Sequence, residues 1–170
     1  MRRLTPLLAL VAIAALAIPA MAASTKLQAF GTGVVDITGP NSATLANDAG
    51  EYSGVYLASK SQSGKPIGSV SFSFTSSGDV AGGAPRFSIP IDTDGNSTVD
   101  GYAFLDVNGC GSSTVSTDSA TCTVYFGNET FANWAAFATA HPTYRIAPGS
   151  IPFIIADQPG NYVITGIDLR

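Results

Sequence analysis

Basic side chains are scarce in this sequence: its 170 residues contain 8 Lys and Arg against 12 Asp and Glu. Nucleic-acid surfaces and adhesive polybasic patches both need clustered Lys and Arg, so this scarcity argues against either role. Without Arg2 and Arg3, which lie in a predicted leader, 6 basic residues remain and the net charge is −6. We interpret this acidity as a source of solubility rather than as the sign of a partner.

Histidine and glutamate are almost absent, with one His and two Glu in the chain. No His-Glu-x-x-His, Gly-x-Ser-x-Gly or Gly-x-x-x-x-Gly-Lys sequence occurs, which excludes the usual zinc, serine-elbow and phosphate-loop sites. His141 is predicted to act as a cation or cap at a helix end rather than as a catalytic base. Glu51 and Glu129, or two of the aspartates, would form a glycosidase pair only if they lay ~5–9.5 Å apart across a cleft.

Long apolar runs are confined to the N-terminus. Residues 1–22 combine two arginines, the apolar run Leu7–Ile18 and the small-x-small sequence Ala20-Met21-Ala22, a pattern that predicts a secretory signal peptide. The apolar run is about 12 residues long, shorter than the ~20 needed to cross a bilayer. We therefore expect a secreted protein with a signal peptide at residues 1–22, a single β-sandwich domain at residues 23–170, and no membrane attachment after cleavage.

Cysteine is also scarce, and export would place the two cysteines, Cys110 and Cys122, in an oxidising compartment where they are expected to pair. Closing the polar segment of 11 residues between them would remove about 3 kcal/mol of unfolded-chain entropy. A redox-active pair is the alternative, but the spacing lacks the Cys-x-x-Cys pattern that tunes the thiol pKa. The prediction is a structural disulfide.

The abundant residues favour strands and turns. Gly accounts for 18 residues and Ser and Thr are frequent, a composition that argues against an all-helical fold. Alternation with a period of two predicts strands at 33–37, 54–58, 70–75, 87–91, 103–107, 121–126 and 162–169, and a nearly continuous apolar run covers 151–155. Pro90 predicts an edge strand or a bulge. Short strands separated by turn residues predict an all-β fold, an antiparallel β-sandwich with a jelly-roll-like arrangement.

One segment departs from the strand pattern. Residues 129–140 are rich in alanine and place several apolar side chains, Trp134 among them, on one helical face. We predict one short helix there, with Asn128 as its N-cap, Glu129 near the positive end of the dipole and Pro142 ending it. Trp134 is predicted to anchor this helix to the sheet, and the alternative is an exposed platform for sugar rings.

The most specific pattern is the acidic loop at residues 92–100, which places oxygen-bearing side chains at its positions 1, 3, 5 and 9. Calcium takes about 6–8 oxygen ligands, and the loop resembles the first part of an EF-hand-type or dockerin-type loop, whose seventh residue contributes a carbonyl oxygen. The predicted calcium ligands are Asp92, Asp94, Asn96, Thr98 and Asp100.

Two departures argue against a true EF-hand: Ser97 replaces the glycine expected at position 6, and Ala103 lies where a bidentate acid is expected at position 12. An ordinary turn between paired strands at 86–91 and 101–107 is the alternative interpretation. In that hairpin the apolar residues of the first strand would face the core. Mutual repulsion of the carboxylates favours an ion slightly, and Asp106 could approach the loop from the neighbouring strand.

Several segments between residues 67 and 170 carry a family resemblance. They are the Gly-Ala-Pro-Arg-Phe segment at 83–87, the Asp-x-Asp-Gly-Asn loop at 92–96, residues 102–106 with Cys110, residues 133–137, and the closing residues 162–169. Together they resemble a group of uncharacterised exported bacterial β-sandwich proteins. The resemblance implies a secreted β-sandwich and carries over no activity. The strand rhythm alone is also similar to that of jelly-roll sugar-binding modules, a likeness of fold rather than of function.

Two classes of function follow. The first is a secreted, non-catalytic binding or surface-associated module with an extracellular carbohydrate or a protein as its partner, and with calcium as a hypothetical stabiliser. The second is a small extracellular hydrolase that acts on polysaccharide or another polymer. A hydrolase requires Asp or Glu side chains with Arg86 or Arg145 in one concave pocket, whereas scattered carboxylates favour the binding module.

Overall fold

The computed structural model describes residues 26–58 and 62–170. The predicted signal peptide at residues 1–22 therefore lies outside the described residues. Among the residues that are described, no helix combines the length and apolar character needed to cross a membrane.

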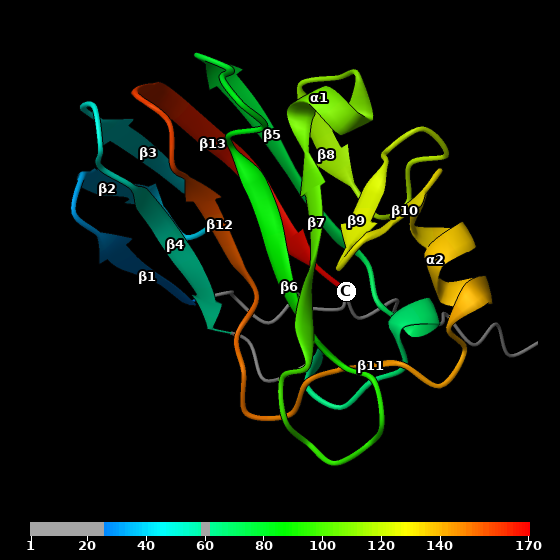
Figure 1. The fold of residues 1–170 in the computed structure, drawn as a ribbon. Helices are drawn as coiled ribbons and strands as arrows, with labels where there is room; N and C mark the ends of the chain where they lie inside the picture. The colour runs from blue at the N-terminus through cyan, green and yellow to red at the C-terminus, as the bar shows by residue number, and fades with distance from the viewer. Residues whose placement is uncertain (1–25, 59–61) are drawn as a thin grey trace, which may run out of the picture.

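Two antiparallel sheets stack on each other (Figure 1). The larger sheet contains, in spatial order, β1 (Lys26–Gly31), β4 (Ser53–Ala58), β12 (Phe153–Ala156), β6 (Arg86–Asp92), β7 (Gly101–Asp106), β9 (Val124–Phe126) and β10 (Glu129–Phe131), with β11 (Arg145–Ile146) beside β6. The smaller sheet contains β2 (Val34–Gly39), β3 (Ser42–Asn47), β13 (Gly160–Leu169), β5 (Phe72–Gly78) and β8 (Thr114–Ser116). The helical segments are η2 (Ile67–Ser69), α1 (Val107–Cys110) and α2 (Trp134–Ala140).

The central strands have the jelly-roll arrangement. Counted along the chain as one to eight, they are β3, β4, β5, β6, β7, β8, β12 and β13. Their spatial order is 1-8-3-6 in the smaller sheet and 2-7-4-5 in the larger sheet. This is the order that two Greek keys produce when they fold into a double sheet. The prediction of an all-β, antiparallel, jelly-roll-like sandwich with one short helix is confirmed.

Aromatic side chains join the two sheets at the centre of the core. The ring centroid of Phe87 on β6 lies 4.7 Å from that of Phe74 and 6.1 Å from that of Phe72, both on β5. Ile89 and Ile91 follow Phe87 at the inward positions of β6, and all three side chains are fully buried. The predicted β6–β7 hairpin and its inward-facing residues are therefore confirmed.

The edge-strand prediction for Pro90 is wrong, because β6 lies in the middle of its sheet. It pairs with β7 on one side and with β12 and β11 on the other. Pro90 lies in the gap between β12 and β11, where its carbonyl accepts a hydrogen bond of 3.0 Å from the amide of Ala147. Proline has no N–H to donate, and this side of Pro90 faces a loop rather than a continuous strand. The absent donor therefore interrupts no ladder of hydrogen bonds.

The helix is shorter than its alanine-rich segment predicts. It begins after Asn133, whose side chain accepts a hydrogen bond of 2.9 Å from the amide of Ala136. The predicted N-cap Asn128 is wrong, because Asn128 lies with Gly127 in the turn that joins β9 to β10. Gly127 has a φ of 58°, a left-handed conformation that favours a tight turn over a helix. Glu129 accordingly begins β10 rather than the helix.

The disulfide between Cys110 and Cys122 is confirmed. Cys110 ends α1, which follows β7, and Cys122 lies just before β9, so both cysteines lie beside the larger sheet. The segment between them carries β8, which pairs with β5 in the smaller sheet. The bond therefore closes a loop that crosses between the two sheets, and the loop is more ordered than its polar composition predicts.

Candidate functional site

The acidic loop brings three of its predicted ligands together. One carboxylate oxygen from each of Asp92, Asp94 and Asp100 lies within 4.8 Å of the others. The side-chain oxygen of a fourth predicted ligand, Asn96, instead accepts hydrogen bonds from the amide and hydroxyl of Thr98. The carboxylate part of the predicted site is thus assembled, and the amide part forms a local turn.

The carboxylates of the loop already have protein donors. Asp92 accepts hydrogen bonds from the amides of Gly95 and Ser97, at 2.8 and 3.0 Å. The amide and then the hydroxyl of Thr93 lower the pKa of Asp100 by donating to it. Ser97 has a φ of 71°, so this position keeps the left-handed conformation for which glycine was expected. These hydrogen bonds hold the loop as a turn. They also reduce the mutual repulsion of the carboxylates, which was the reason for expecting an ion.

Asp106 lies far from the acidic loop, so the expectation that it approaches the loop is wrong. In the β6–β7 ladder it pairs with Arg86, whereas the loop joins the opposite ends of these strands (Figure 1). Its side chain accepts a hydrogen bond of 2.7 Å from the amide of Gly109 and caps α1. Asp106 therefore stabilises α1, the short helix that ends at Cys110.

The possible catalytic groups are dispersed. His141 lies 3.2 Å from Glu129 and stacks on the ring of Tyr144, with 4.2 Å between centroids. Its backbone amide also ends α2 by donating to Phe137, as expected for a residue at a helix end. Glu51 instead accepts a hydrogen bond from the amide of Asp48 in the turn before β4. The two glutamates therefore belong to different parts of the molecule.

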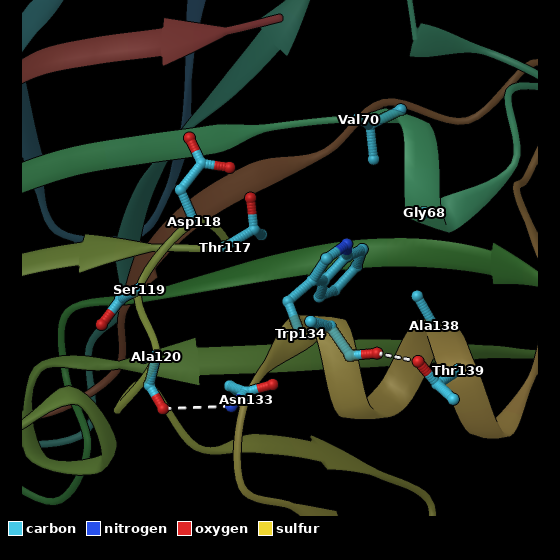
Figure 2. A pocket seen from close by; sticks show the side chains of 11 residues that line it. Gly68, Val70, Thr117, Asp118, Ser119, Ala120, Asn133, Trp134, Ala138 and Thr139 are labelled. Atoms are coloured by element: carbon cyan, nitrogen blue, oxygen red, sulfur yellow. Dashed lines mark hydrogen bonds between the residues drawn. The ribbon is translucent and has the colours of Figure 1, made fainter.

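A groove beside α2 has a tryptophan in its wall (Figure 2). Trp134 is only 4% exposed, and its indole N–H donates a hydrogen bond of 2.8 Å to the carbonyl of Ile67 in η2. Its predicted role as a core anchor is confirmed, and the sugar-platform alternative is wrong. Asp118 in the same groove is paired with the Ser71 hydroxyl and with Arg170.

Three surface hollows, formed by residues within 26–58 and 62–170, bear on the hydrolase alternative. The groove beside α2 contains a single carboxylate, Asp118, and the other two hollows contain none. Neither Arg86 nor Arg145 lines any of the three. These hollows therefore lack the carboxylate pair that glycoside hydrolysis requires.

A different feature stands out on the outer face of the larger sheet. Residues directly opposite each other in neighbouring strands share a face, so the strand registers identify one continuous outward row across seven strands. The row runs in the order Gln28, Tyr56, Phe153, Ser88, Phe104, Tyr125 and Thr130. Phe30 and Tyr102 lie beside it, two positions along β1 and β7. We call these nine residues the aromatic band.

The rings of the band support one another. Phe153 makes edge-to-face contacts with Phe30, Tyr56 and Tyr102, at centroid distances of 5.5, 5.7 and 5.6 Å. Phe30 also lies 4.4 Å from Tyr56. Such contacts restrict the rotation of each ring, so the surface is organised before any ligand arrives.

Two small residues leave room for the rings on the outer face of the sheet. A Cβ atom at Gly54 would lie 2.4 Å from the ring of Phe30, so only glycine leaves room for that ring. Ser88 pairs with both Phe153 and Phe104 and is almost completely covered. The shape of the band therefore depends on these small side chains beneath the rings.

Three tyrosines of the band remain open to solvent. The exposed fractions are 37% for Tyr56, 37% for Tyr102 and 39% for Tyr125. Two of these tyrosines also line a shallow hollow of about 410 Å³, together with Gln28, Ser150, Ile151 and Phe153. The surface thus combines apolar ring faces with hydroxyl and amide groups, the combination found in ligand sites.

Charge is confined to the margin of the band. Arg86 donates two hydrogen bonds to Asp157, at 2.8 and 2.7 Å, and its guanidinium carbon lies 5.6 Å from the centre of the Phe104 ring. The hydrogen bonds from Arg86 hold the pKa of the Asp157 carboxyl below its usual range. The arginine is thereby neutralised, and all nine residues of the band are uncharged.

The band was missed from the sequence, although a signal for it exists. Alternation with a period of two marks the inward positions of a strand, and the outward positions of such a strand are ordinarily polar. In Val55-Tyr56-Leu57 and Val124-Tyr125-Phe126, however, the outward residue is aromatic and the apolar run is unbroken. Unbroken apolar runs in an antiparallel sheet indicate that the outer face carries apolar side chains as well as the inner face.

The sequence has no match among models of protein families and none among curated proteins.

Proposed function

We propose that the protein is an exported, non-catalytic binding module that holds its ligand on the aromatic band. The observation that supports this most strongly is the row of self-supporting rings, three of them exposed tyrosines, across one face of the sandwich. The largest contiguous apolar patch on a soluble protein is often functional, which makes this face the first candidate for a binding site. The signal-like residues 1–22 and the Cys110–Cys122 disulfide support export.

The hydrolase alternative has less support. Its carboxylates are engaged elsewhere: Glu129 with His141, Asp157 with Arg86, and Asp118 with Arg170. Of the three hollows described above, the groove beside α2 contains one carboxylate, Asp118, and the other two contain none. The band itself contains no carboxylate, histidine, lysine or cysteine, so the hydroxyls of Ser88, Thr130 and the tyrosines have no general base among its nine residues.

Sedimentation with insoluble polymers separates binding from hydrolysis. The mature protein is mixed with cellulose, starch granules or collagen fibres, and both the protein left in the supernatant and the soluble fragments released are measured. We expect depletion of the protein by at least one polymer without release of fragments. Depletion should disappear in the double variant Tyr56→Ala with Tyr102→Ala.

A matched control lies on the other face of the sandwich. Val163 is an exposed residue of β13 in the smaller sheet, and Val163→Ala should bind as the parent protein does. Release of fragments above a heat-inactivated control would support the hydrolase instead. Depletion that survives the double tyrosine substitution, or no depletion by any polymer, would contradict the proposal.

Calcium binding by the acidic loop is kept as a secondary hypothesis about stability rather than recognition. It is supported by the convergence of Asp92, Asp94 and Asp100 and by the left-handed Ser97. The loop lies at the end of the β6–β7 hairpin, so an ion there would stiffen two of the strands that carry the band.

A further inference from the structure

We infer that the ligand of the aromatic band is a neutral polysaccharide whose chain runs across the strands, along the row from β1 to β10. This inference rests on the proposed function and specifies the class of its ligand. Size, charge and the available hydrogen-bonding groups each favour this occupant.

The size of the band fits a chain better than a folded partner. Seven neighbouring strands spaced ~4.8 Å apart make the row about 29 Å long, and it is only one to two side chains wide. A stable protein–protein interface needs about 800 Å² on each partner. A second copy of this chain, or another folded protein, would therefore bury too little surface on the band alone, whereas an extended polymer would cover its whole length.

The charge of the band favours a neutral ligand. None of the nine residues is charged, and the neighbouring Arg86 is occupied by Asp157. An anionic polymer would find no free cation in the band, and the acidic protein as a whole would repel it. A cationic polymer would likewise find no carboxylate in the row.

The hydrogen-bonding groups favour a sugar over a peptide. Extended peptides gain affinity by pairing their main chain with an exposed strand edge. The band instead covers a sheet face, where the backbone groups are already used in the ladders on both sides of the central strands. A sugar ring has an apolar C–H face that stacks on an aromatic ring, and a rim of hydroxyls that can bond to tyrosine hydroxyls and to the Gln28 amide.

The shallow hollow is the place where one sugar unit would be held most closely. Tyr56, Tyr102 and Phe153 form its aromatic walls, and Gln28 and Ser150 supply polar groups at its rim. Because Phe153 contacts both tyrosines edge to face, the walls have a fixed spacing without a ligand. Two further rings, Phe104 and Tyr125, continue the surface toward β10 for further units of the chain.

Affinity electrophoresis in gels that contain soluble polymers tests the inference. The neutral probes are hydroxyethylcellulose, galactomannan and soluble starch, and the comparison probes are polygalacturonate as an anionic polymer and gelatin as a polypeptide. We expect retardation by at least one neutral polymer, unchanged by 0.5 M NaCl because no charge is involved, and no retardation by polygalacturonate. Tyr102→Ala should weaken binding about tenfold or more, and Val163→Ala should leave it unchanged.

Two further variants separate a lost contact from a lost fold. Tyr102→Phe keeps the stacking ring and should retain most of the affinity, and the thermal transition of Tyr102→Ala should stay close to that of the parent. Retardation by gelatin alone that Tyr102→Ala abolishes would overturn the polysaccharide inference while the proposed binding module stands. Salt-sensitive retardation by polygalacturonate alone, or no retardation by any neutral polymer, would also overturn it. Retardation by a neutral polymer that Tyr102→Ala leaves intact would overturn both proposals.

Discussion

The ring of Phe87 on β6 packs against the ring of Phe74 on β5 at 69°, with 4.7 Å between centroids, and so joins the two sheets at their centre. Both side chains are fully buried. Phe87 also occupies the inward position next to Ser88, which is the small residue of the aromatic band between Phe153 and Phe104. One strand therefore carries the core contact on one face and the base of the proposed binding surface on the other.

Removal of the Phe87 ring should destabilise the fold strongly. Phe87→Ala leaves a cavity between the sheets, and we expect a loss of about 3–5 kcal/mol in the free energy of unfolding. Urea denaturation of the variant and the parent measures it. A loss below about 1 kcal/mol would mean that Phe87 does not fill the core as the structure shows.

The disulfide should protect the fold. Native protein should show no thiol that reacts with an aromatic disulfide reagent, and reduction should lower the melting temperature by several degrees, because the loop between Cys110 and Cys122 regains chain entropy. The double variant Cys110→Ala with Cys122→Ala provides the control, since its melting temperature should not respond to reductant. Two reactive thiols in the native exported protein would contradict this prediction.

The Arg86–Asp157 pair predicts a contribution to acid sensitivity. Folding lowers the pKa of Asp157, mainly through the hydrogen bonds from Arg86, so the folded state favours the charged carboxylate. The resulting stability is present above the unfolded pKa of about 3.9 and is lost as the pH falls through the lower folded value. Melting curves from pH 6 to pH 2 should show a smaller acid-induced decrease for Asp157→Asn than for the parent. Equal decreases in the two proteins would show that the pair contributes nothing to this dependence.

Calcium should raise the melting temperature if the acidic loop holds an ion. Binding only to the folded state, at a free concentration 100 times the Kd, adds about 2.7 kcal/mol of stability. Asp94→Asn with Asp100→Asn keeps the shape of the turn and removes two charges, so this variant should not respond. Identical melting curves in millimolar calcium and in chelator, or an equal response of the variant, would show that the loop is only a turn.

Residue alternation was sufficient to predict the sandwich, because one side of each strand must face the core. The inward set Phe87, Ile89 and Ile91 shows this directly. Alternation could not reveal the gap opposite Pro90, which depends on where β11 and β12 end beside β6. The start of the helix was predicted too early, because the turn at Gly127 and Asn128 interrupts a segment of helical composition.

The candidate site was only partly predictable, for a physical reason. The acidic loop is a local feature, so its carboxylates could be found from their spacing in the sequence. The aromatic band is not local: Tyr56, Phe153 and Tyr102 meet only after three separate strands are placed in register. Sequence spacing carries no information on that register, although the unbroken apolar runs around Tyr56 and Tyr125 show that these strands have two apolar faces.

The central claim is that the aromatic band binds a neutral polysaccharide, and a nuclear magnetic resonance titration tests it most directly. An oligosaccharide fragment of the neutral polymer that gives the strongest retardation is added to the protein, and the ring-proton signals of the tyrosines and the indole signal of Trp134 are followed. We predict progressive shifts for Tyr56, Tyr102 and Tyr125, whereas the buried Trp134 indole, which is bonded to Ile67, stays unchanged. Shifts at Trp134 and the groove beside α2, with no change in the three tyrosines, would contradict the claim.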